Sequence, residues 1–107
     1  MRIRISYSDQ NESLRSLFPV SGSLGEAEIH AAEGEHVWRI VELDHPIVSA
    51  AGEFGKLLIA SRWKGRSVTD PETSVFVLGM PVTCADPIER FNVNMYPRLV
   101  WGMATPE

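Results

Sequence analysis

A chain of 107 residues with 44% hydrophobic and 22% charged residues has the length of one domain and enough apolar side chains for a single core. This composition excludes an intrinsically disordered chain, and a net charge of −4 disfavours general nucleic-acid binding, because phosphate contacts need clustered Lys and Arg. The single cysteine excludes an intramolecular disulfide framework and a cysteine-based zinc cluster. We therefore predict one domain over residues 1–107.

The first segments of the chain predict a strand, a helix and a loop. In Arg2–Tyr7, Ile3 and Ile5 share one face, which is typical of a half-buried strand. A short helix is expected over Asp9–Phe18, because this segment begins with a good N-cap residue and has a glutamate at the capping-box position. Ser21–Gly25 is then predicted as a loop.

A hairpin is expected next. Glu26–Ala31 alternates again, with every second residue from Ala27 facing inward, and Glu33–Glu35 has the composition of a tight turn. This turn leads into a second strand of the hairpin, His36–Leu43. The following segment, Asp44–Gly55, contains proline and glycine and is predicted as a connection.

Three further strands are expected, at Lys56–Trp63, Thr73–Val82 and Pro97–Met103. A polar loop over Lys64–Glu72 and a helical turn over Asp86–Phe91 separate them, and Ala104–Glu107 is expected to fray. These later strands carry apolar residues on both faces, so both faces must be covered. One short helix covers only part of the second face, and a curled sheet or a partner subunit is needed for the rest.

The short spacing between the expected strands favours antiparallel pairing, because parallel neighbours need long crossovers. We predict a mainly β fold: about six antiparallel strands in a small barrel or strongly curled sheet, with one short N-terminal helix. The alternative is an α+β sandwich with the helix packed across the sheet. No segment approaches the roughly 18–20 apolar residues of a membrane-spanning helix or resembles a secretory signal, so we expect a soluble, cytoplasmic protein.

Catalytic and metal-binding motifs are missing from the sequence. It has no nucleophile elbow, no Cys-x-x-Cys pair and no His-Glu-x-x-His motif. His30 and His36 flank the expected turn with glutamates nearby, but a metal site needs three or four converging ligands, and we interpret both as solvated hairpin residues. We predict no catalytic residue, no cofactor and no bound metal.

The densest basic cluster, Arg62–Arg66, also contains a tryptophan. Cations beside a stacking ring can bind an anion, a nucleotide or a single strand of nucleic acid. The structural interpretation, which the negative net charge of the chain favours, is a strand end at which Trp63 anchors the core while its charged neighbours solvate the turn.

These observations favour a small non-enzymatic binding protein that docks a protein partner through an acidic hairpin surface, as an inhibitor or immunity protein does. The alternative is a barrel that binds a small ligand or single-stranded nucleic acid through the Arg62–Arg66 region. An enzyme whose site is assembled from scattered residues is a third possibility. We expect a protein partner or a homodimer, and neither a membrane nor a nucleic-acid partner. The candidate binding residues are Arg62, Trp63, Lys64, Arg66, Glu28, His30, Glu33, Glu35 and His36.

Overall fold

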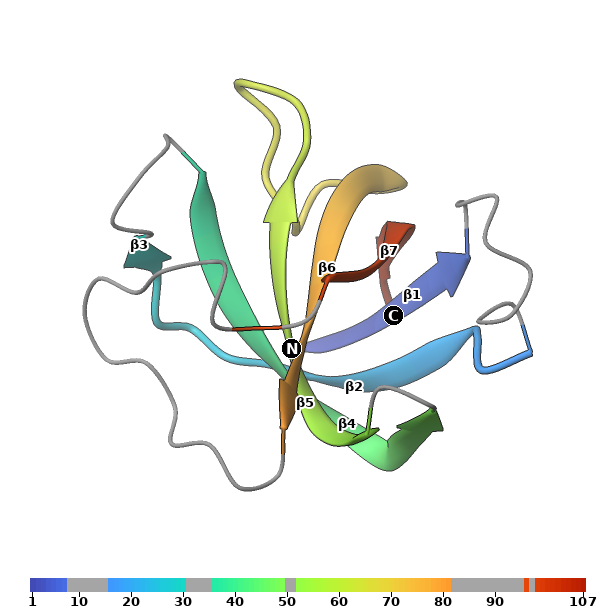
Figure 1. Ribbon diagram of the computed structural model, residues 1–107. Helices are drawn as coiled ribbons and strands as arrows, with labels where there is room; N and C mark the ends of the chain where they lie inside the picture. The colour runs from blue at the N-terminus through green and yellow to red at the C-terminus, as the bar shows by residue number, and fades with distance from the viewer. Residues whose placement is uncertain (8–15, 31–35, 50–51, 82–95, 97) are drawn as a thin grey trace.

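The computed structural model describes residues 1–7, 16–30, 36–49, 52–81, 96 and 98–107, which form seven strands and no helix (Figure 1). The strands are β1 (Arg2–Tyr7), β2 (Val20–Leu24), β3 (Ile29–His30), β4 (Val37–Ser49), β5 (Gly52–Ser61), β6 (Thr73–Pro81) and β7 (Arg98–Pro106). The first predicted strand is confirmed with the same bounds, and the other long strands overlap the predicted ones.

Six of these strands close into an antiparallel barrel. They are hydrogen-bonded in the order β2-β1-β7-β6-β5-β4, and β2 also pairs with β4, which joins the two ends of the sheet (Figure 1). The short β3 pairs with the first residues of β4. The predicted small antiparallel barrel is confirmed, and the closed ring of strands excludes the α+β sandwich.

Alternation along the strands produces two apolar clusters. The interior of the barrel is filled by Ile3, Ile5, Leu24, Val41, Leu43, Ile47, Phe54, Leu57, Ile59, Val68, Val75, Val77 and Ala104. The second cluster, outside the barrel, consists of Ile29, Trp38, Leu58, Ala60, Leu78, Met80 and Tyr96. Leu58 and Ala60 are 0% exposed, so the chain itself covers both faces of β5.

The loop predicted at Ser21–Gly25 is wrong, because most of this segment belongs to strand β2. Its Ser-Gly-Ser composition is typical of a loop, but Gly22 has a tertiary role. A Cβ atom at residue 22 would overlap the carbonyl oxygen of Glu42 in β4. The glycine therefore lets β2 and β4 approach closely where the barrel closes.

The connection predicted over Asp44–Gly55 is also wrong. Strand β4 continues to Ser49, and β5 begins at Gly52. The pairing of the two strands is irregular between Glu42 and Ile47. Such an irregularity accommodates Pro46, because a proline cannot donate a hydrogen bond to a neighbouring strand.

The C-terminal residues 104–107 do not fray. Ala104 pairs with Ile5 on one side and with Thr73 on the other, and it is 0% exposed. The backbone N–H of Glu107 donates to the carbonyl oxygen of Arg2 at 3.0 Å. The expectation failed because β7 is the strand that joins β1 to β6, which a local pattern does not reveal.

The predicted strand Glu26–Ala31 is shorter in the structure. Only Ile29 and His30 are in a strand, and Ala27 is exposed instead of facing inward. The helix expected over Asp9–Phe18 falls largely on residues 8–15, outside the described residues, and the described residues 16 and 17 form a turn. The expected turns at 33–35 and 86–91 also lie outside the described part. Within that part, no helix is both long and apolar enough to cross a membrane.

Candidate binding pocket at the β5–β6 loop

The loop between β5 and β6, residues 62–72, lies at one end of the barrel, opposite the β4–β5 hairpin (Figure 1). The predicted polar loop is thus confirmed. One apolar residue of this loop, Val68, is only 4% exposed and belongs to the interior cluster. The loop therefore folds over this end of the barrel, with Val68 contributing to its core.

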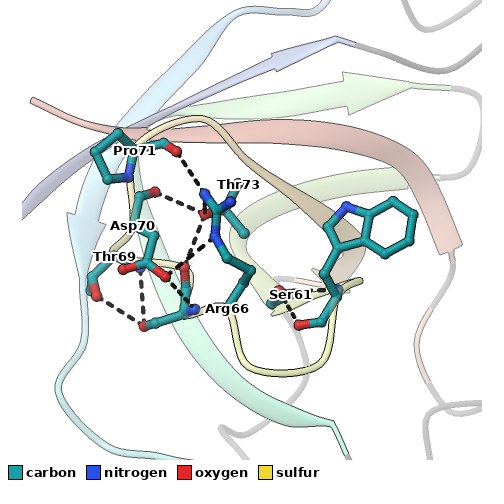
Figure 2. Close-up of polar contacts among 8 residues, drawn as sticks. Ser61, Arg66, Thr69, Asp70, Pro71 and Thr73 are labelled. Atoms are coloured by element: carbon teal, nitrogen blue, oxygen red, sulfur yellow. Dashed lines mark hydrogen bonds and ion pairs between the residues drawn. The ribbon is translucent and has the colours of Figure 1, made fainter.

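Hydrogen bonds within the loop fix its shape. The buried Thr73 Oγ1 lies 3.0 Å from the carbonyl oxygen of Ser67 and 2.9 Å from that of Asp70 (Figure 2). The carboxylate of Asp70 accepts from the backbone N–H of Ser67 at 2.9 Å. Arg66 spans the same turn, donating to the carbonyl oxygen of Pro71 at 3.0 Å, with its Nε 3.5 Å from Asp70 Oδ2. These contacts hold residues 66–73 in one conformation and thereby fix the positions of the side chains that this loop carries.

The backbone of Trp63 is held by hydrogen bonds, whereas its side chain is exposed. Ser61 Oγ donates to the carbonyl oxygen of Trp63 at 3.0 Å and accepts from its N–H at 3.2 Å. The Trp63 side chain is nevertheless 59% exposed. The interpretation of Trp63 as a core anchor is therefore wrong, because the strand ends at Ser61 and the interior of this end is filled by Val68 instead.

Arg62 lies among aromatic rings on the outer face of the barrel. Its guanidinium carbon is 4.3 Å from the ring centroid of Trp101, 5.7 Å from that of Trp63 and 5.8 Å from that of Phe76. Arg62 Nη1 also donates to Ser74 Oγ at 3.3 Å. Trp101 and Phe76 face each other across β6 and β7, so strand pairing places both rings beside the cation.

Beside the loop there is a pocket of about 410 Å³. It is lined by Glu28, His36, Val37, Arg39, Ser61, Arg62, Trp63, Lys64, Gly65, Arg66, Ser67 and Val68. The β4 residues Val37 and Arg39 continue the inward-facing series of that strand beyond Val41, so the pocket lies where the barrel interior opens outward.

The pocket is basic although the protein is acidic. Four of the ten Lys and Arg residues line it, with Glu28 as the one acidic residue of the lining. Arg39 Nε donates to the carbonyl oxygen of Gly25 at 2.8 Å, which fixes this guanidinium at the pocket wall. His36 Nδ1 donates to the carbonyl oxygen of Ser61 at 3.2 Å. Because that carbonyl oxygen only accepts, Nδ1 carries a proton in this arrangement.

Most of the candidate binding residues meet in this pocket. Six of them line it: Arg62, Trp63, Lys64, Arg66, Glu28 and His36. His30 does not line it, and Glu33 and Glu35 lie outside the described residues. The sequence reasoning missed Arg39. The sequence signal for Arg39 was a charged residue at an inward-facing position of a strand. Its place beside the loop depends on its pairing with Ile59 of β5, and this pairing is determined by the strand register.

The chemistry that these side chains offer is attraction of an anion together with an apolar or aromatic contact. Among the described residues no cluster of three or more His, Cys, Asp or Glu side chains could hold a metal ion. A second pocket, of about 350 Å³, lies at the opposite end of the barrel and includes Asp44, His45 and Val48. There the guanidinium of Arg2 pairs with the carboxylate of Asp44, so the principal charge at that end is already compensated.

Comparison of the chain with protein-family models, with curated proteins and with solved structures gives no match.

Proposed function

We propose that this protein is a non-enzymatic binding protein that holds an anionic ligand in the pocket beside the β5–β6 loop. The observation that carries the proposal is the gathering of Arg39, Arg62, Lys64 and Arg66 around one concavity of a chain whose net charge is −4. Like charges repel one another, so such a concentration is destabilising unless counter-charges offset it. Asp70 beside Arg66 and Glu28 in the lining supply part of that counter-charge, and a bound anion would add to it.

Two of these cations are already held in position. Arg39 is fixed by its bond to Gly25, and Arg66 by its contacts with Asp70 and Pro71. A guanidinium has five N–H donors in a fixed plane, so it can keep these bonds and still donate to a ligand. Prior positioning lowers the entropy lost on binding, which favours affinity for a small ligand.

The docking of a protein partner through an acidic hairpin stays a prediction. Glu28 lies among the cations of the pocket, and Glu33 and Glu35 lie outside the described residues. A homodimer and a cytoplasmic location likewise stay predictions. The outer-face residues Leu58 and Ala60 are already buried within one chain, so the two-sided strand β5 does not itself require a partner subunit.

The proposal is tested by titrating isotopically labelled protein with inorganic pyrophosphate and following backbone amide resonances by NMR. We expect the largest shifts in residues 62–68 and at Arg39, and weaker binding as the salt concentration rises. Charge reversal by Lys64→Glu should weaken binding by about tenfold, a typical effect of removing a charge-assisted contact. Arg4→Glu makes the same change of charge at an exposed residue of β1 that does not line the pocket.

The control variant separates a site from a general effect of charge. If Arg4→Glu weakens pyrophosphate binding as much as Lys64→Glu, the anion is attracted by the whole protein and the pocket has no special role. If pyrophosphate moves no resonance of the pocket at millimolar concentration, the protein does not bind anions there and the proposal is wrong.

A further inference from the structure

Trp63 differs from six other aromatic residues of the described part of the chain. Trp63 is 59% exposed, whereas the six are buried or half-buried: Phe18, Trp38, Phe54, Phe76, Tyr96 and Trp101. Trp63 lies on the rim of the basic pocket, and Val37, another exposed apolar residue, lines the same pocket. Two exposed apolar side chains beside four cations make a surface that suits a ligand with both an apolar and an anionic part.

The Trp63 ring is also positioned before any ligand arrives. Both backbone polar groups of Trp63 bond to Ser61 Oγ, and the Arg62 guanidinium lies over the ring at 5.7 Å. Arg62 is itself packed against Trp101 and Phe76. A ring supported by a cation on one side and still more than half exposed is a platform on which a second planar ring can stack.

We infer that the anionic ligand of the pocket carries a planar aromatic ring, as a nucleoside monophosphate does, and that this ring stacks on Trp63 while the phosphate contacts the Lys and Arg residues. The inference rests on the proposed function and adds the class of ligand. A pocket of about 410 Å³ falls in the usual range for small molecules. The acidic remainder of the protein opposes a long polyanion, which favours a free nucleotide over a nucleic-acid strand.

The test compares four probes by isothermal titration calorimetry and tryptophan fluorescence: AMP, ribose 5-phosphate, adenosine and a single-stranded hexadeoxyadenylate. We expect AMP to bind about tenfold more tightly than ribose 5-phosphate, because stacking of a base on an aromatic side chain adds affinity. Trp63→Leu should abolish this preference, so that the variant binds AMP and ribose 5-phosphate with equal affinity. Trp63→Phe should retain most of the preference, because it keeps an aromatic ring.

Each alternative result has a distinct meaning. Equal affinities for AMP and ribose 5-phosphate would overturn the stacking inference and leave the anion pocket in place. Equal affinities for AMP and adenosine would mean that the cations contribute nothing, which contradicts the proposed function. Binding of the hexadeoxyadenylate without binding of AMP would overturn the choice of a free nucleotide. An AMP preference that survives in Trp63→Leu would place the ring elsewhere and refute the role of Trp63.

Discussion

Gly79 of β6 lies directly against the ring of Phe54 of β5, because a Cβ atom at residue 79 would be only 2.7 Å from Phe54 Cδ1. Phe54 is 0% exposed and belongs to the interior cluster. Small barrels commonly combine large and small residues so that their interiors fill without overlap. Gly79 therefore provides the space for Phe54, the largest fully buried side chain among the described residues.

Replacing Gly79 by alanine should destabilise the fold. The added methyl group has to displace a fully buried ring, and such overpacking costs about 1–3 kcal/mol. Urea unfolding followed by circular dichroism measures the change. The matched experiment is Phe54→Leu alone and combined with Gly79→Ala. If the clash is the cause, the double variant loses less stability than the sum of the two single variants, and strictly additive losses would contradict it.

The hydroxyl of Thr73 should contribute more to the stability of the β5–β6 loop than its methyl group does. Thr73 is 1% exposed, and its Oγ1 lies within hydrogen-bond distance of two loop carbonyl oxygens. Thr73→Val keeps the shape but leaves these acceptors without the hydroxyl, at a cost of about 1–3 kcal/mol. Hydrogen exchange should show faster exchange of the amides in residues 66–70. Thr73→Ser retains the hydroxyl and should preserve slow exchange; if both variants exchange equally fast, the hydroxyl does not hold the loop.

Replacing Arg62 by lysine should destabilise the protein, although it keeps the positive charge. Its planar guanidinium lies 4.3 Å from the centroid of Trp101 and also donates to Ser74. A lysine keeps the charge but cannot stack, so Arg62→Lys should lower the free energy of unfolding by about 0.5–2 kcal/mol and alter tryptophan fluorescence. Arg62→Ala should behave similarly. A fully stable Arg62→Lys variant would show that charge alone is needed and that the stacked geometry contributes nothing.

Local patterns were sufficient where burial alternates along a strand. Arg2–Tyr7 was predicted with correct bounds, because Ile3 and Ile5 are both 0% exposed and their neighbours face outward. Strand β2 was missed, because Gly22 is typical of a loop when only its sequence neighbours are considered. In the closed barrel, the backbone of Glu42, a residue distant in sequence, leaves no space for a Cβ atom at residue 22.

For the pocket too, local sequence patterns indicated one part, and tertiary contacts determine the rest. The run Arg62–Arg66 was recognisable because its cations and its tryptophan are neighbours in sequence. Their environment was not recognisable. Whether Trp63 is buried depends on which residue fills the end of the barrel, and that residue is Val68 from the far side of the loop. Arg39 joins the pocket only through the register of β4 with β5. Residues that act together through strand pairing leave no common motif in the sequence.

The ion pair between Arg2 and Asp44 should make stability depend on pH in the acid range. The hydrogen bond from Arg2 holds the pKa of Asp44 below its ordinary value of 3.8, since the guanidinium favours the charged carboxylate. The folded state therefore gains stability from Asp44 above pH 3.8 and loses it as the pH falls through the lower pKa of the folded state. Both side chains are substantially exposed, so the contribution is modest and weakens with salt.

Asp44→Asn tests this linkage through melting temperatures measured from neutral pH to below 3.8. The variant should be less stable than the parent at neutral pH, and the two curves should converge once Asp44 of the parent is protonated. Glu53→Gln removes an exposed carboxylate outside this ion pair and serves as the control. Parallel curves for Asp44→Asn and the parent across the whole range would mean that the carboxylate titrates alike in the folded and unfolded states. The link that Arg2 and Asp44 form between β1 and β4 would then contribute no stability through its charge.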